Sequence, residues 1–176
     1  MKKILHISSA LLIVVFLAGC GYSVRSASLG KLKTIYVEPF KNKISYGSQN
    51  TRNIYLPLLE VNVTNAVIDR YLFDGNLKIG KKETADLTLR GELIDYRRDA
   101  LRYTDGNDVQ EYRITITIAI TLWDNAEGKA LWSETSFAGD TTYFTTGVQA
   151  KSESTALQDA LTDLARRVVE RTVENW

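Results

Sequence analysis

The clearest feature of the hydrophobic pattern is a strict alternation of apolar and polar residues from Asp108 to Asp124. Large apolar side chains occupy every second position, and threonine, arginine and alanine occupy the positions between them. A two-residue period places successive side chains on opposite faces of a β-strand. The segment therefore predicts a strand with one buried face, formed by Tyr112, Ile114, Ile116, Ile118, Ile120 and Leu122.

Three further segments have the pattern of strands. Residues 34–40 alternate and end at a proline and a phenylalanine, and the polar residues 41–53 that follow are typical of a loop. Residues 85–98 also alternate, but their apolar positions change phase beside Gly91, which indicates a β-bulge. Residues 130–143 follow a tight connection at 125–128, so we expect this strand to pair antiparallel with the one before it.

Two segments have the period of an amphipathic helix. The first runs from about Tyr55 to Leu72, with Pro57 in its first turn, and ends at the turn residues 74–76. The second runs from Ser152 to Trp176, with acidic residues early and arginines late, which complements the helix dipole.

The predicted order of elements is therefore strand, helix, strand, strand, strand, helix. Strands with one apolar face and helices with one apolar stripe combine most simply in two layers. We expect an α+β fold of residues 34–176, a two-layer sandwich in which a four-stranded, mainly antiparallel sheet carries both helices on one face. The other face of the sheet would stay uncovered and polar, with Thr88, Arg90, Glu92, Thr115, Thr117 and Thr121 on it.

The first nineteen residues have the features of a secretory signal. Lys2 and Lys3 precede an uninterrupted apolar stretch from Ala10 to Ala18. This stretch is far shorter than the roughly 20 residues that a membrane-spanning helix needs, which argues against a transmembrane anchor. Residues 1–19 are thus predicted to be a signal peptide that is removed.

The signal ends in a bacterial lipoprotein box. Leu17-Ala18-Gly19-Cys20 places the one cysteine of the chain where the thiol would be joined to diacylglycerol. Several acyl chains on Cys20 would anchor the protein permanently to a membrane. Lipoproteins of the inner membrane carry an aspartate at the next position, whereas this chain has Gly21. The resemblance to bacterial lipoproteins therefore implies the outer membrane of a Gram-negative envelope. The tether, residues 20–33, reaches at most about 45 Å and would keep the folded domain near that membrane.

Composition excludes several kinds of chemistry. Lysines and arginines number 22 and acidic residues 21, so the charge does not suggest a nucleic-acid partner. Removal of residues 1–19 also removes His6, the only histidine, and leaves Cys20 as the only cysteine. Catalytic triads, Cys/His pairs, histidine-ligated metals and disulfides are thereby excluded from the mature chain. No metal or cofactor is expected.

Four segments together resemble the LPS-assembly lipoprotein family LptE, also called rare lipoprotein B. They are Gly21-Tyr22 directly after the lipoprotein box, IYVEPFKN at 35–42, ADL to GEL at 85–93, and the closing helix from Ala156 to Trp176. The resemblance covers nearly the whole mature chain. It implies a non-enzymatic subunit of the lipopolysaccharide (LPS) export machinery, which plugs the β-barrel LptD, helps it assemble and contacts LPS.

Cations near the strand ends are candidates for the LPS contact. Arg97, Arg98 and Arg102 lie in the connection between the second and third predicted strands, and Lys129 lies at the tip of the next hairpin. Guanidinium groups suit bidentate contact with the phosphates of lipid A. Ordinary surface ion pairs are the alternative, because carboxylates alternate with these arginines in the sequence, at Asp95, Asp99, Asp105 and Asp108.

Two other functions remain open at this point. An outer-membrane lipoprotein could act as a periplasmic partner-binding regulator of a cell-wall enzyme. The short tether argues against this function, because a long linker is needed to cross the periplasm. Glu92 and Asp95 could act as the carboxylate pair of a hydrolase, but nothing in the sequence marks them as a pair.

The lipoprotein box gives the first testable prediction. Replacing Cys20 with Ala should yield an unacylated protein that is either released from the membrane or left unprocessed, because no other thiol is available. Mass spectrometry of the N-terminal peptide and fractionation of membranes would measure both effects, with Ser23→Ala as the control. An unchanged acylated peptide in the Cys20→Ala protein would contradict the prediction.

Overall fold

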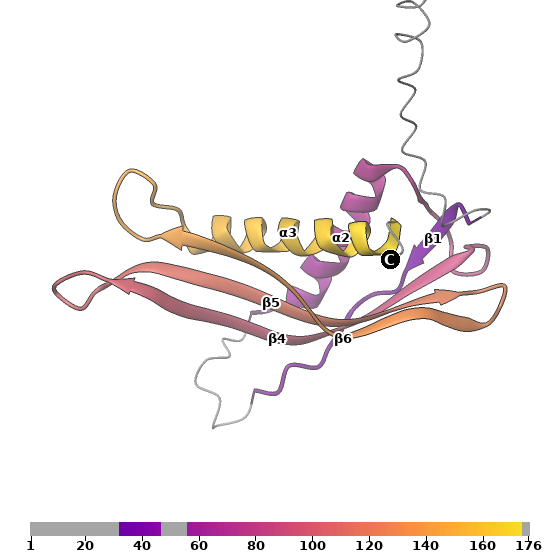
Figure 1. The fold of residues 1–176 in the computed structure, drawn as a ribbon, viewed down its shortest axis with the longest axis horizontal. Helices are drawn as coiled ribbons and strands as arrows, with labels where there is room; N and C mark the ends of the chain where they lie inside the picture. Colours follow the sequence, from indigo (N-terminus) through magenta and orange to yellow (C-terminus); the bar gives the residue numbers. More distant parts are fainter. Residues whose placement is uncertain (1–31, 47–55, 174–176) are drawn as a thin grey trace, which may run out of the picture.

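The computed structural model describes residues 32–46 and 56–173, which form an α+β domain (Figure 1). The signal peptide, Cys20 and most of the predicted tether lie outside these residues. Within the described ranges, no helix is long and apolar enough to cross a membrane. The elements are, in chain order, β1 (Thr34–Val37), β2 (Lys41–Asn42), α2 (Leu59–Asp74), β3 (Lys78–Ile79), β4 (Leu87–Tyr103), β5 (Val109–Asp124), β6 (Lys129–Phe144) and α3 (Glu153–Val173).

The sheet is mixed and has six strands, so the expectation of four mainly antiparallel strands is wrong in part. Its order is β3-β1-β4-β5-β6, and β2 also pairs with β4. β4, β5 and β6 are antiparallel as predicted, whereas β1 and β2 run parallel to β4 and β3 runs parallel to β1. β2, in the predicted loop, and β3 have two residues each, too few to show a period. The parallel pairing of β1 arises because α2 carries the chain back before β4 begins.

β4 is longer than predicted, and its bulge lies elsewhere. The strand continues to Tyr103, and its register with β5 shifts between Leu93 and Asp95 rather than at Gly91. Gly91 instead makes room for an aromatic ring, because a Cβ atom at this position would lie 2.1 Å from the ring of Phe40. The change of phase in the sequence therefore reports a bulge that begins two residues farther along the strand.

Both helices cover the same face of the sheet, as predicted (Figure 1). The alternating apolar residues of β5 are buried on that face, and Ile114, Ile116 and Ile118 are 0% exposed. Residues of β4 and of both helices complete this core, among them Leu89, Leu93, Val63, Leu164 and Val168.

α3 packs very closely on β6. A Cβ atom built on Gly139 would lie 2.5 Å from both the backbone and the Cβ of Leu164. Leu164 itself is 1% exposed, so the helix backbone rests directly on the strand at this point. Any side chain at position 139 would push the helix away from the sheet.

The two helices are joined by a buried hydrogen bond. The hydroxyl of Tyr71 on α2 donates to Oγ1 of Thr172 on α3 at 2.8 Å, and Thr172 in turn donates to the carbonyl oxygen of Val168. Burial raises the pKa of Tyr71 well above its ordinary value, so this hydroxyl stays protonated. α2 begins at Leu59, and Pro57 lies in the turn before the helix rather than inside its first turn.

The contact between Gly139 and Leu164 predicts a large loss of stability on substitution. Gly139→Ala should lower the free energy of unfolding by about 2 kcal/mol or more, because helix backbone cannot move aside as a flexible side chain would. Gly106→Ala is the matched control, since its nearest neighbour would be the Thr104 hydroxyl at 3.8 Å. Urea denaturation of both variants measures the difference, and equal stabilities would contradict the packing of α3.

Candidate functional site

The face of the sheet opposite the helices is the candidate site, and we call it the open face. It carries the polar positions of the alternating strands, as the sequence predicts. Arg90 on β4 lies across from Thr121 on β5, and Arg97 lies across from Thr115. Thr117 is 7% exposed, so this face is not polar and wet along its whole length.

A groove of about 560 Å³ lies on the open face. Four separate segments form it: the link between β1 and β2, the turn before β4, the first part of β4 and the last part of β5. Sequence periodicity could not bring these segments together. We call it the open-face groove, and its charged and aromatic lining residues are Glu38, Lys41, Lys82, Arg90, Glu92 and Trp123.

The groove combines one paired arginine with two lysines that have no ion pair. Arg90 stacks over the ring of Trp123 at 4.7 Å, and its Nε lies 3.6 Å from a carboxylate oxygen of Glu38. Lys41 and Lys82 are exposed, and neither forms an ion pair within the described residues. An amphipathic anion would therefore meet two available ammonium groups beside an aromatic surface.

The contrast between cations with and without an ion pair extends over the described part of the chain. Every lysine and arginine there from Arg90 onward has an ion pair with a carboxylate. None of the described cations before Arg90 has one. These earlier cations are Lys33, Lys41, Lys43, Arg70, Lys78, Lys81 and Lys82.

The three predicted arginines lie in β4 and not in a loop, which corrects the sequence-based placement. β4 continues through these positions because their backbones pair with β5. Arg98 forms an ion pair with Glu153 at the start of α3, and its guanidinium lies 4.8 Å from the ring centre of Tyr112. Burial disfavours the charged form, but Glu153 outweighs it and raises the pKa of Arg98. Arg98 therefore serves the contact between sheet and helix.

Arg97 and Arg102 are more exposed and are also paired. Nε of Arg97 lies 2.8 Å from the carboxylate of Asp95, and Nε of Arg102 lies 3.6 Å from that of Glu111. The guanidinium of Arg102 also lies 5.7 Å from the ring centre of Phe144. In the structure, these two arginines therefore form ordinary surface ion pairs, which is the alternative to an LPS contact that the sequence left open.

Lys129 lies far from the three arginines. It begins β6 and pairs with Asp124, which lies across from Leu87 at the start of β4, whereas Arg102 lies near the other end of β4. Its Nζ is 2.6 Å from Glu127, and this hydrogen bond raises the pKa of Lys129. The four predicted cations do not form one site. Lys129 and the open-face groove lie at the same end of the sheet.

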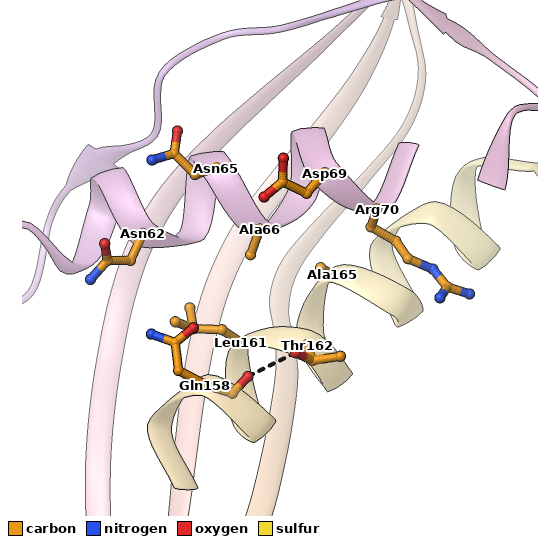
Figure 2. Close-up of a pocket in the computed structure, with 9 residues that line it drawn as sticks. All are labelled: Asn62, Asn65, Ala66, Asp69, Arg70, Gln158, Leu161, Thr162 and Ala165. Carbon is orange, nitrogen blue, oxygen red and sulfur yellow. Dashed lines mark hydrogen bonds between the residues drawn. The ribbon is translucent and has the colours of Figure 1, made fainter. Parts of the chain in front are cut away.

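A second hollow, of about 290 Å³, lies between α2 and α3 (Figure 2). Its lining mixes uncharged polar side chains with apolar ones, and the Thr162 hydroxyl donates to the carbonyl oxygen of Gln158 at 2.8 Å. Arg70 lies at one end, with its guanidinium directed away from the other labelled side chains. The hollow follows from the crossing of two helices, and Asp69 and Arg70 are its two charged lining residues.

An α+β domain with two helices on one face of a mixed sheet is the class of protein that the structure defines. Solved structures with this fold include a protein of Xanthomonas campestris (TM-score 0.57, 12% identity, 80% of this chain and 84% of that chain covered). Lipoprotein B of Nitrosomonas europaea shares the fold with a TM-score of 0.51 and 15% identity, over 81% of this chain and 83% of that chain. A minor lipoprotein of Acinetobacter baumannii shares it with a TM-score of 0.50 and 14% identity, over 81% of this chain and 94% of that chain. No curated protein matches the chain.

The sequence places the chain more narrowly within this class. Residues 32–172 match the family described as LptE, lipopolysaccharide-assembly. The chain belongs to the LptE family, as its resemblance in four segments predicts.

The different surroundings of neighbouring arginines give a prediction about stability. Arg98→Ala should lower the free energy of unfolding by about 1–2 kcal/mol, since it removes the ion pair with Glu153 and the stacking on Tyr112. Arg97→Ala, the matched control, should change it by under about 0.5 kcal/mol, as expected for an exposed pair. Chemical denaturation tests this. A larger loss for Arg97→Ala than for Arg98→Ala would show that the two roles are reversed.

Proposed function

We propose that this protein is a non-enzymatic, lipid-anchored subunit of lipopolysaccharide assembly at the outer membrane. The match of residues 32–172 to the LptE family carries the proposal. The lipoprotein box at Cys20 and the glycine that follows it support anchoring in the inner leaflet of that membrane. No observation favours a regulator of a cell-wall enzyme, and Asp95 of the hydrolase hypothesis is already paired with Arg97.

The domain occupies the lumen of an LptD-type β-barrel in this proposal. The open face supports this location, because threonines and charged pairs suit the water-filled interior of a large barrel and do not suit the acyl region of a membrane. A sheet with helices on one side only also leaves a broad surface to lie against the barrel wall. Burial of the same face under a third layer would require its charged groups to lose water without compensation.

The open-face groove is the LPS contact in this proposal. Lipid A carries phosphates next to acyl chains, and the groove offers Lys41, Lys82 and the Arg90–Trp123 stack. Lysines without carboxylate partners can bind a phosphate without breaking an existing pair. Arg97, Arg102 and Lys129 remain secondary candidates, because each would first have to leave its carboxylate.

Co-purification tests the barrel partner. Tagged protein extracted from membranes should carry an LptD-type β-barrel that mass spectrometry identifies, and the complex should persist in high salt if contacts over the whole sheet hold it. Recovery of the tagged chain without any β-barrel, from membranes that contain LptD, would contradict the proposal. The acylation state of the N-terminal peptide is measured in the same preparation.

The LPS contact is tested by removing two charges at a time. Lys41→Gln/Lys82→Gln should weaken binding of the acylated protein to immobilised LPS by roughly 3- to 10-fold, the scale of two screened charge contacts. Arg97→Gln/Arg102→Gln removes the same charge and is the matched control, with a smaller expected effect. Both pairs are exposed, so the midpoint of thermal unfolding should stay nearly unchanged.

The outcome separates the two sets of cations. If the arginine variant loses more binding than the lysine variant, the contact lies along β4 and the groove assignment is wrong. If neither variant loses binding, the open face is not the LPS contact, and the barrel and anchor parts of the proposal stand on their own tests.

A further inference from the structure

The C-terminal end of α2 exposes large apolar side chains. Leu72 is 63% exposed and Phe73 is 81% exposed, and neither belongs to the core. The helix stops directly after them at Gly75, whose N–H donates to the carbonyl oxygen of Tyr71. We call Arg70, Leu72 and Phe73 the α2 tip.

The α2 tip lies near the point where the chain enters the domain. The N–H of Lys78, the first residue of β3, donates to the carbonyl oxygen of Lys33 at 2.9 Å. Phe73 is five residues from Lys78, a stretch of chain that spans at most about 18 Å. Figure 1 accordingly shows α2 ending on the side of the molecule where β1 lies.

The start of β1 is held firmly in place. One carboxylate oxygen of Asp86 accepts hydrogen bonds from the N–H of Lys33, the N–H of Thr34 and the hydroxyl of Thr34, at 2.8–2.9 Å. The bonds from Lys33 and Thr34 hold the pKa of Asp86 below its usual value, so the clamp is charged at neutral pH. The chain therefore leaves the domain toward its N-terminus from a defined point beside the α2 tip.

The length of chain before this point limits how far away the anchor can be. Leu32, the first described residue, is twelve residues after Cys20. Twelve residues span at most about 43 Å even when fully extended. An acylated Cys20 therefore holds the start of β1 within about 43 Å of the bilayer. The opposite end of the long β4–β5 ladder is farther from the start of β1.

The charges around the α2 tip suit a headgroup layer. Arg70 is the one arginine of the described residues without an ion pair, and its guanidinium lies 5.3 Å from the ring centre of Phe73. Lys33 and Lys78, whose backbones share the hydrogen bond between β1 and β3, are exposed. Among the nearby carboxylates, Asp74 already accepts a hydrogen bond from the side-chain amide of Asn76 at 2.8 Å.

We infer that the α2 tip docks on the phospholipid bilayer that holds the acyl chains of Cys20. Leu72 and Phe73 enter the boundary between headgroups and acyl chains, and Arg70 meets lipid phosphates beside them. This contact orients the domain relative to the membrane, which a tether alone does not do. The inference rests on the proposed acylation of Cys20.

The N-terminal end of α2 is a poorer candidate for this contact. Leu58 and Val61 are also exposed, but they lie at the far end of the helix from the Lys33–Lys78 hydrogen bond. Val148 is 106% exposed and follows β6, at the end of the sheet away from β1. It provides a control position that is even more exposed than Phe73.

The experiment places a dye at each end of the acylated full-length mature protein. Because the sulfur of Cys20 is consumed by the lipid, Phe73→Cys and Val148→Cys each introduce one reactive thiol for the environment-sensitive dye NBD. Each protein is reconstituted in vesicles of phosphatidylethanolamine and phosphatidylglycerol, with and without lipids that carry a nitroxide near the top of the acyl chain. We expect the dye at position 73 to shift to the blue and to be quenched severalfold more strongly than the dye at position 148.

A second probe tests the native side chains themselves. A dye on Asn76→Cys should be quenched in the otherwise native protein and should lose most of this quenching when Leu72→Ser/Phe73→Ser is added. Both side chains are largely exposed, so these changes should not unfold the domain. Circular dichroism confirms the folded state of each variant.

The outcomes distinguish this inference from the proposed function. Equal quenching at positions 73 and 148, or none at either in an acylated protein, would overturn the docking of the α2 tip while the anchor stands. Shielding of position 73 only after an LptD-type barrel is added would assign the tip to that protein and overturn the lipid contact. A Cys20 thiol that reacts with the dye would show that the anchor itself is absent, and both conclusions would then be wrong.

Discussion

Burial of one face of the sheet beneath a single layer of helices is the constraint on which the rest of the structure depends. The isoleucines of β5 can leave water only on the side that α2 and α3 cover, and burial of each contributes about 1.5–3 kcal/mol. α3 comes close enough because Gly139 lets the backbone at Leu164 rest on β6. Arg98 and Glu153 join the same two layers toward the end of the sheet that lies away from β1.

The same constraint determines what the open face can do. Alternation on β5 means that each residue that completes the core is followed by one on the open face, and most of these face water or a polar partner, with the buried Thr117 as an exception. On the half of this face that lies away from β1, arginines pair with carboxylates, as Arg97 does with Asp95 and Arg113 with Asp140. Cations without such partners collect near the start of β4, where segments with no regular period meet, among them Lys41 and Lys82.

The sequence allowed prediction of the elements that are long and regular. The strand at β5, the helix at α3 and the placement of both helices on one face followed from many repeated periods, so single exceptions did not matter. β2 and β3 contain two residues each and gave no period to detect. The arginines of β4 were misplaced because polar residues on a strand beyond a bulge resemble a loop. The open-face groove was missed because its lining comes from residues as far apart as Glu38 and Trp123.

The distribution of apolar surface limits how such a domain can meet a lipid membrane. An open face of threonines and charged pairs cannot enter the acyl region, because its polar groups would lose water without gaining partners. On the outward side of the helix layer, the hollow between α2 and α3 is lined by Asn62, Asn65, Gln158 and Thr162 together with smaller apolar and charged contributions. At the end of the domain where the chain enters, the α2 tip combines exposed apolar area with Arg70, which has no carboxylate partner among the described residues. The proposed barrel contact and the inferred lipid contact therefore use different surfaces, so neither contact would cover the other.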